Sequence, residues 1–170
     1  LFGQCFGKSK IMKIDRIMMG MPIIVEIIGE DNKVQSVIND VFDYFDYIDK
    51  TFSVYKENSE ISKINRGEIL PQKYSNDMRE IFELAEKTKL ETNGYFDINN
   101  GKIVDPSGIV KGWAIYKAGQ LIRQKGFQNF YVNAGGDIEL GGHNSQGKKW
   151  KVGLVNPFDT KTSIKTLYLS

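Results

Sequence analysis

The stretch from Asp105 to Trp113 combines a carboxylate, a turn of small residues and a lysine. The apolar spacing over residues 114–122 predicts one buried helix face, so the stretch lies at the start of a helix. Free N–H groups and the positive end of the helix dipole bind anions at such a position. Gly108 allows a ligand to approach the backbone closely, and Lys111 adds a mobile positive charge. Taken alone, these features are a weak signal for a phosphate site.

Two further segments carry side chains that suit a planar ring. Methionines flank a glycine between Met18 and Pro22, and methionine packs adaptably against flat aromatic surfaces. Tyr55 offers a ring for stacking and a hydroxyl for a hydrogen bond. Each segment also has a simpler interpretation, in which the methionines fill the core near a strand and Tyr55 is a half-buried surface residue.

Two glycine-bearing segments could also face a ligand. Tyr95 and Phe96 precede Asp97, and an aromatic pair beside a carboxylate suits a ring recognised by stacking and a hydrogen-bond acceptor. Asp97 could equally be a turn or cap residue. The run from Asn133 to Asp137 contains two glycines, which permit close ligand approach but also suit a simple hairpin turn.

Composition excludes several classes of protein. The chain has 23 basic and 21 acidic side chains, and this near-balance favours neither a nucleic-acid partner nor a polybasic membrane patch. A single cysteine and a single histidine exclude a disulfide framework and a histidine-rich or cysteine-based metal centre. No P-loop or dinucleotide-binding glycine motif occurs.

No stretch approaches the roughly 20 apolar residues of a membrane-spanning helix. His143 lies in a polar turn and is predicted to be exposed and without a function.

Hydrophobic periodicity predicts an α+β domain, with a mixed or antiparallel sheet and packed helices. The chain length of 170 residues suits one domain. The predicted helices cover residues 32–50, 60–65 with Ser59 as cap, and from Ser75 to just before Asn93, followed by the helix after Asp105. The predicted strands cover residues 12–28, 130–132, 138–140, 150–155 and 166–169, and residues 52–60 form a loop or short strand.

The segments, in this order, resemble the FAD:protein FMN transferases, the ApbE family. The resemblance extends from about Met12 to Pro157. The matching pieces are Met19-Gly20, Tyr55 with Ser59–Asn65, Gly94–Asp97, Asp105–Trp113, Val132–Ile138 and Trp150–Leu154 before Pro157.

The resemblance implies a T-fold-like flavin transferase architecture and a specific chemistry. Members bind FAD, use Mg²⁺, and transfer the FMN half to a threonine or serine of a target protein while releasing AMP. The FAD contacts implied for this chain are Met19, Tyr55, Tyr95, Phe96, Asp97, Asp105 and Lys111. Gly108 is the implied metal contact, through its backbone carbonyl, and no catalytic residue is assigned.

The sequence departs from the family pattern in two places. Only Ile98 to Val104 separates the Asp97 segment from the Asp105 motif, where the family carries a longer insertion. The family's C-terminal stretch with further metal ligands is not found before Ser170. We therefore expect one flavin-transferase-like domain over residues 1–170 without the C-terminal portion. The alternatives are a non-catalytic FAD-binding module and a structural half-domain that another chain completes, with self-association through an exposed sheet edge.

The resemblance also suggests an extracytoplasmic or membrane-anchored bacterial protein. The run from Leu1 to Cys5 weakly resembles a lipoprotein acceptor cysteine, although no apolar leader precedes it. A cloning remnant or a partly buried free thiol is the favoured interpretation of Cys5.

Overall fold

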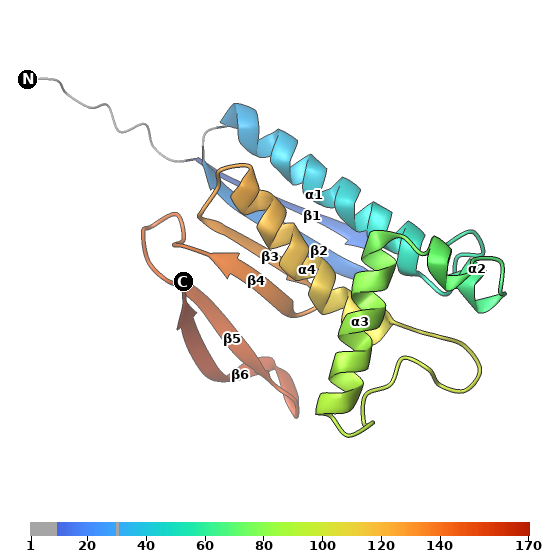
Figure 1. Ribbon diagram of the computed structural model, residues 1–170. Helices are drawn as coiled ribbons and strands as arrows, with labels where there is room; N and C mark the ends of the chain where they lie inside the picture. The colour runs from blue at the N-terminus through green and yellow to red at the C-terminus, as the bar shows by residue number, and fades with distance from the viewer. Residues whose placement is uncertain (1–9, 30) are drawn as a thin grey trace, which may run out of the picture.

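The computed structural model of the protein describes residues 10–29 and 31–170 (Figure 1). Four antiparallel strands form one sheet in the order β1-β2-β3-β4, and a separate antiparallel pair joins β5 to β6. The strands are β1 (Lys10–Met18), β2 (Met21–Gly29), β3 (Phe130–Ala134), β4 (Asp137–Gly141), β5 (Trp150–Asn156) and β6 (Asp159–Leu169). The helices are α1 (Asp31–Phe52), α2 (Glu60–Asn65), the short 3₁₀ turn Pro71–Lys73, α3 (Asn76–Glu91) and α4 (Ser107–Gln124). The predicted α+β class is confirmed.

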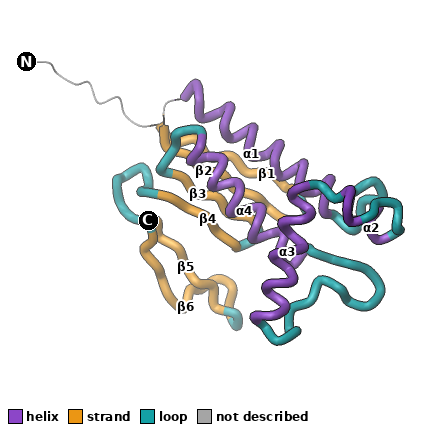
Figure 2. Tube along the Cα trace, in the orientation of Figure 1, coloured by secondary structure: helices purple, strands orange, loops and turns teal. Residues whose placement is uncertain are grey.

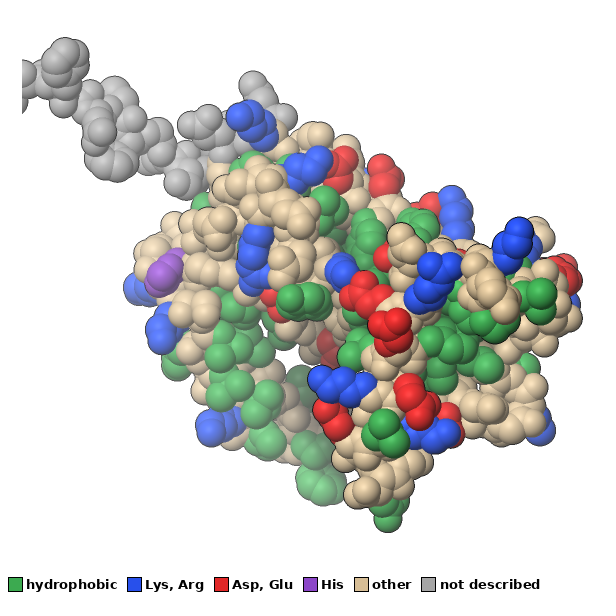
Figure 3. Space-filling model, in the orientation of Figure 1, with side chains coloured by type: hydrophobic (Ala, Val, Ile, Leu, Met, Phe, Trp, Pro, Cys, Tyr) green, Lys and Arg blue, Asp and Glu red, His purple; other side chains and the backbone are tan. Residues whose placement is uncertain are grey.

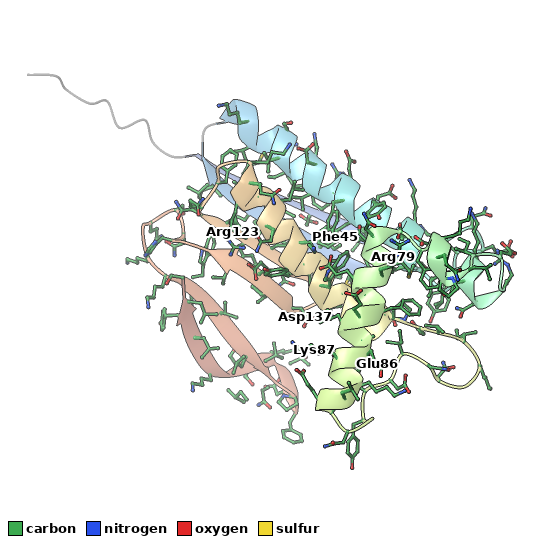
Figure 4. All side chains as sticks on the ribbon, in the orientation of Figure 1. Phe45, Arg79, Glu86, Lys87, Arg123 and Asp137 are labelled. Carbon is green, nitrogen blue, oxygen red and sulfur yellow. The ribbon has the colours of Figure 1, made fainter. Side chains whose placement is uncertain are left out.

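The core lies between the sheet and two long helices that run side by side across it (Figure 1). Helix α1 contacts β1 and β2, and α4 contacts β3 and β4. Alternate residues of β2 and β3 are buried against these helices, as expected for a sheet with one covered face. Phe45 from α1 is almost completely buried in this layer (Figure 4).

The predicted strand over residues 12–28 is two strands rather than one. Met18 pairs with Met21, so Met19 and Gly20 form a two-residue hairpin turn. Both have positive φ, 52° and 73°, which is the conformation that lets a tight turn match the twist of its strands. The prediction was wrong because methionine rarely adopts this conformation, so Met19 gave no turn signal and Gly20 alone did not divide the apolar run.

The helix predictions are confirmed with small shifts at the ends. Ser59 caps α2 and accepts a hydrogen bond from the backbone N–H of Ser62, and Ser75 caps α3 by accepting from Met78. These side-chain oxygens satisfy N–H groups that have no partner within the helix. Helix α3 ends before Asn93 as predicted, and residues 53–58 form a turn-rich loop.

The β5–β6 hairpin extends away from the four-stranded sheet (Figure 1). Its second strand is longer than the predicted residues 166–169. Trp150 anchors its base, because the buried indole donates to the carbonyl of Gly141 at 2.9 Å and its ring lies 5.5 Å from that of Tyr131. Several apolar side chains of the hairpin are exposed, Phe158 and Ile164 among them.

Among the described residues, no helix has both the length and the apolar character of a membrane span. Cys5 and the Leu1–Cys5 run lie outside the described residues.

Candidate functional site

A cavity of about 470 Å³ opens where the β1–β2 turn, the end of α1 and the start of α4 meet. Its apolar lining comes from Met19, Met21, Ile48, Phe52, Val54 and Val110. Its polar lining comes from Asp49, Ser53, Tyr55, Ser107 and Lys111, with Gly20 at the turn. A mostly apolar hollow with a few polar groups is the usual form of a small-molecule site.

The β1–β2 turn brings a sulfur side chain to one wall of this cavity. Met19 stands at the turn and is partly buried against the core. Next to it, the backbone N–H of Gly135 donates to the carbonyl of Pro22 at 3.1 Å. The β3–β4 turn is thereby held against the start of β2, so two hairpin turns lie together beside the cavity.

A second wall carries Tyr55, in the loop between α1 and α2. The Tyr55 side chain is 93% exposed and lines the cavity, so it is not the half-buried residue of the simpler interpretation. An aromatic side chain that is free at the mouth of an apolar cavity can stack on a flat ligand without repacking the core. The loop is closed at its base by the bond from Ser59 Oγ to the Ser53 carbonyl, 2.7 Å long.

The start of α4 forms the third wall. The carboxylate of Asp105 accepts from the backbone N–H of Ser107 at 3.0 Å, and Pro106 occupies the N-cap position without a side-chain cap. The backbone N–H of Ser107 is thus already bonded to a carboxylate, and those of Ile109 and Val110 are bonded to the Pro106 carbonyl. The positive end of the α4 dipole still favours an anion at this end of the helix. Lys111 places its ammonium on the same side, one helical turn further along.

The ammonium of Lys111 lies at the β3–β4 turn. Its Nζ is 3.0 Å from a carboxylate oxygen of Asp137. Figure 4 labels Asp137, which lies at the start of β4. Gly135 and Gly136 make this turn with φ of 57° and 97°. A methyl group at Gly135 would lie 3.0 Å from the sulfur of Met21, which is a tight contact, and 3.5 Å from the Lys111 ammonium, which is an ordinary one. The predicted glycine-bearing bend between two strands is confirmed.

The structure brings Met19, Tyr55 and Lys111 to one cavity and places the other predicted residues elsewhere. Tyr95 is 96% exposed and lines no described cavity. Phe96 packs beside Gly108, where a methyl group would lie 3.3 Å from the ring. Asp105 and Gly108 stand at the start of α4, next to the lining residue Ser107 rather than in the lining itself.

Asp97 belongs to a second, smaller cavity of about 210 Å³ between α3 and the following loop. It pairs with Lys89 at 2.8 Å and accepts the backbone N–H of Asn99 at 2.9 Å. The hydrogen bond from Lys89 and then that from Asn99 hold the pKa of the Asp97 carboxyl below its usual range. These contacts fit the turn-residue interpretation of Asp97.

Asp49 is a lining residue that the sequence reasoning did not identify. It stands near the end of α1, between Ile48 and Phe52 of the same lining, and pairs with Lys56 at 2.6 Å. The spacing of the buried residues in α1 predicted the helix face. It did not predict that the end of that face, where Ile48 and Phe52 remain in the core, also borders a cavity.

Mixed charges cover the visible surface near α3 and α4, without a patch of one sign (Figure 3). Among residues 10–29 and 31–170, no group of three His, Cys, Asp or Glu side chains is placed to hold a metal ion. His143 is exposed in its turn, as predicted. The cavity therefore combines an apolar slot and a free aromatic ring with one cationic, anion-binding end. That combination suits a ligand with a flat ring and a phosphate group.

Comparison with known proteins gives three results. The sequence profile of the ApbE family matches residues 19–105 and 99–170, and the two matches meet where the sequence predicted a shortened connection. A FAD:protein FMN transferase of Vibrio cholerae is 31% identical over 64 residues, which are 38% of this chain and 19% of that protein. The enzyme of the same name from Haemophilus influenzae is 35% identical over 57 residues, 34% of this chain and 16% of that protein. The aligned segments thus span less than a fifth of these curated relatives.

Two solved structures share the fold. The flavin transferase ApbE from Vibrio cholerae matches with a TM-score of 0.77 at 16% identity, over 94% of this chain and 67% of that chain. The ApbE protein from Thermotoga maritima matches with a TM-score of 0.81 at 18% identity, over 94% of this chain and 68% of that chain. At these identities the superposition establishes the architecture, which is the one that the sequence resemblance implied.

Proposed function

This chain belongs to the ApbE family, and we propose on that premise that it binds FAD and transfers FMN to a threonine or serine of a target protein. The observation that carries the proposal is the single cavity shared by Met19, Tyr55 and Lys111. Three segments far apart in the sequence supply these side chains, and the fold brings them together. Their chemistry matches the two halves of a dinucleotide, a flat ring and a charged diphosphate.

The two ends of the cavity have different parts in binding. The methionine wall and the exposed ring of Tyr55 take a flat heterocycle by packing and stacking. Lys111 and the start of α4 take the diphosphate, because a lysine ammonium and a helix N-terminus both stabilise phosphate charge. Asp105, Tyr95, Phe96 and Asp97 remain proposed FAD contacts through the family resemblance.

The proposed reaction replaces the phosphoanhydride bond of FAD with a phosphoester bond to the acceptor. The hydroxyl oxygen of the acceptor bonds to the phosphorus of the FMN half, and the bridging P–O bond of the diphosphate breaks. AMP leaves with the bridging oxygen, and the hydroxyl proton is released. Lys111 would stabilise the charge that develops on the diphosphate oxygens. None of the described residues is assigned as the base that accepts the proton.

Mg²⁺ is part of the family's chemistry, but the described residues alone do not fit a magnesium site. No three acidic side chains converge within them to form a full protein ligand set, so most oxygen ligands of Mg²⁺ would have to be water and substrate phosphate. Asp105, the nearest carboxylate in sequence to Gly108, already accepts the Ser107 N–H. We keep the Gly108 carbonyl as the proposed contact and assign no step to the metal.

The proposal is tested by incubating the protein with FAD, Mg²⁺ and an acceptor protein that carries a flavinylation threonine. The expected result is an acceptor heavier by one FMN, seen by mass spectrometry, with an equal amount of AMP. The control is the same acceptor with its threonine replaced by alanine. FAD binding without any adduct or AMP would reject transfer by this chain.

A non-catalytic FAD-binding module is the second candidate function. The absence of a converging metal-ligand set among the described residues favours it. It predicts quenching of FAD fluorescence on titration with the protein, without release of AMP. A chain that neither binds FAD nor releases AMP would instead support a structural half-domain that a second polypeptide completes.

Cellular location and assembly are further parts of the proposal. The family resemblance supports an extracytoplasmic or membrane-anchored bacterial protein, which fractionation of the producing cell checks. The exposed apolar side chains of the β5–β6 hairpin support self-association. Sedimentation of the purified chain as a concentration-independent monomer would reject that association.

A further inference from the structure

We propose that Asn65 is a positioning residue that holds the anion-binding start of α4 in register with the loop that carries Tyr55. Asn65 touches neither the cavity nor, by inference, the ligand. The inference rests on the proposed function, since it assigns a role in flavin binding to a residue outside the binding site.

The side-chain amide of Asn65 forms two hydrogen bonds with the backbone of Val104, as the backbone of a neighbouring strand would. Its Nδ2 donates to the Val104 carbonyl at 2.9 Å, and its Oδ1 accepts the Val104 N–H at 2.8 Å. The two residues are 39 positions apart in the sequence. Val104 immediately precedes Asp105, whose carboxylate accepts the backbone N–H of Ser107 at the start of α4. The amide of Asn65 therefore fixes the segment from which α4 begins.

The other end of α2 is tied to the Tyr55 loop. Ser59 Oγ donates to the Ser53 carbonyl at 2.7 Å while it caps the helix. Ser62 Oγ lies 3.5 Å from the carbonyls of Ser53 and Val54, at the outer limit of a hydrogen bond. Ser59 and Ser62 are both buried. Buried side-chain bonds of this kind define one arrangement of the loop.

Helix α2 thus connects two walls of the cavity without lining it. The loops before and after α2, and the long loop that leads to α4, gather at the same end of the molecule (Figure 2). The backbone around Val104 has little regular structure of its own, with a single isolated bridge between Asn99 and Val104. Asn65 provides bonds from outside this loop, so its loss should leave the start of α4 less well placed.

The contacts of α2 account for the sequence motif Ser59–Asn65, which contact with a ligand does not account for. The run Ser59–Asn65 belongs to the sequence resemblance, yet none of its residues lines the cavity. Its polar members at positions 59, 62 and 65 bind backbone groups on either side, and Ile61 is completely buried in the core.

The first test compares two variants of α2 by titrating FAD fluorescence. Asn65→Ala removes both bonds to Val104 and should weaken FAD binding by about tenfold, the effect of displacing a charged binding group from its place. Ile61→Val destabilises the same helix through the core but leaves the bonds intact, so its FAD affinity should equal that of the wild type. Thermal unfolding of both variants shows whether they lose comparable stability.

The second test uses pH to restore the missing bonds. In Asn65→Asp the carboxylate faces the Val104 carbonyl and repels it at neutral pH, so FAD binding should be as weak as in Asn65→Ala. When the carboxyl takes up a proton, it regains one donor and one acceptor and can bind Val104 on both sides. FAD affinity relative to wild type should therefore recover, in this variant only, as the pH falls from 7 toward the ordinary aspartate pKa of about 3.9. Asp105 and the Arg66–Glu68 pair, the nearby charges in sequence, are unchanged in all three proteins.

Two outcomes separate failure of this inference from failure of the proposed function. Wild-type protein that binds FAD, with Asn65→Ala binding equally well, would overturn the positioning role. Absence of FAD binding by the wild type would overturn the proposed function. Amide hydrogen exchange then tests directly whether the side chain of Asn65 holds the backbone of Val104. The Val104 N–H should exchange slowly in the wild type and in Ile61→Val but quickly in Asn65→Ala. Equal protection in all three proteins would show that Asn65 does not hold the backbone of Val104.

Discussion

The ammonium of Lys111 and the carboxylate of Asp137 form an ion pair of 3.0 Å at the edge of the cavity. The pair joins the first turns of α4 to the start of β4. Asp137 is more exposed than Lys111, with 58% against 31% of the side chain accessible. Lys111 therefore already has a counter-ion beside it before an anion binds. The positive charge of Lys111 should favour anion binding, and the negative charge of Asp137 should oppose it.

Substitutions at this pair are expected to have opposite effects on FAD affinity. Lys111→Met should weaken binding by about tenfold or more, because a hydrogen bond to a charged group is lost. Asp137→Asn should strengthen binding by about two- to fivefold, because a negative charge beside the diphosphate is removed while the shape is kept. Fluorescence titration at low and high salt measures both, and the differences should shrink as salt screens the charges. Equal affinities in all three proteins would place the diphosphate elsewhere.

Replacement of Tyr55 should separate binding from stability. The side chain is 93% exposed, so Tyr55→Ala should change the free energy of unfolding by less than about 0.5 kcal/mol. Loss of the proposed stack should weaken FAD binding by about fivefold to tenfold. Tyr55→Phe is the matched control, since it keeps the ring and should keep most of the affinity. A Tyr55→Ala protein with wild-type affinity would remove Tyr55 from the site.

Two glycines of α4 should respond in opposite ways to the same substitution. A methyl group at Gly112 meets no atom within 4 Å, whereas one at Gly119 would overlap the Cγ of Glu139. Gly112→Ala should stabilise the protein by up to about 1 kcal/mol through helix propensity. Gly119→Ala should destabilise it by about 1–3 kcal/mol through overpacking, because the Glu139 side chain, which pairs with Arg123, must shift. Denaturant unfolding of both variants checks the sign of each change.

The contact between Glu80 and Trp113 should make stability depend on pH in the acid range. The indole N–H of Trp113, and then Lys117, hold the pKa of the Glu80 carboxyl below its ordinary value of 4.5. A carboxyl with a lowered folded-state pKa stabilises the fold fully above its unfolded value, and this contribution is lost as the pH falls through the folded value. The loss should therefore begin below about pH 4.5 and continue downward.

Glu80→Gln is the control for that dependence. Because the carboxylate is partly exposed, its contribution should not exceed about 1 kcal/mol. The variant should be less stable than the wild type at pH 7, and the difference should narrow at pH 3. Chemical denaturation at the two pH values measures it. A difference that is constant with pH would show that the charge of Glu80 does not contribute.

Elements with strong periodicity or capping signals were predictable from the sequence. Ser59 and Ser75 stand where the chain changes from loop to apolar repeat, and both cap helices. Local hydrogen bonding and side-chain spacing determine such elements, and these can be read within a short window. The turn at Met19 and Gly20 was missed for the converse reason, since the pairing of β1 with β2 imposes a conformation that methionine seldom adopts.

The sequence by itself determined the family, the helix boundaries and the residue types able to meet a flat ring and a phosphate. Only the tertiary structure decided which of those residues share a cavity, because Met19, Tyr55 and Lys111 meet through the pairing of β2 with β3 and the packing of α1 on α4. It also decided that Asn65 bonds to Val104 rather than to a ligand. Local spacing specifies which way a side chain faces on its own element, whereas long-range contacts specify what stands opposite it.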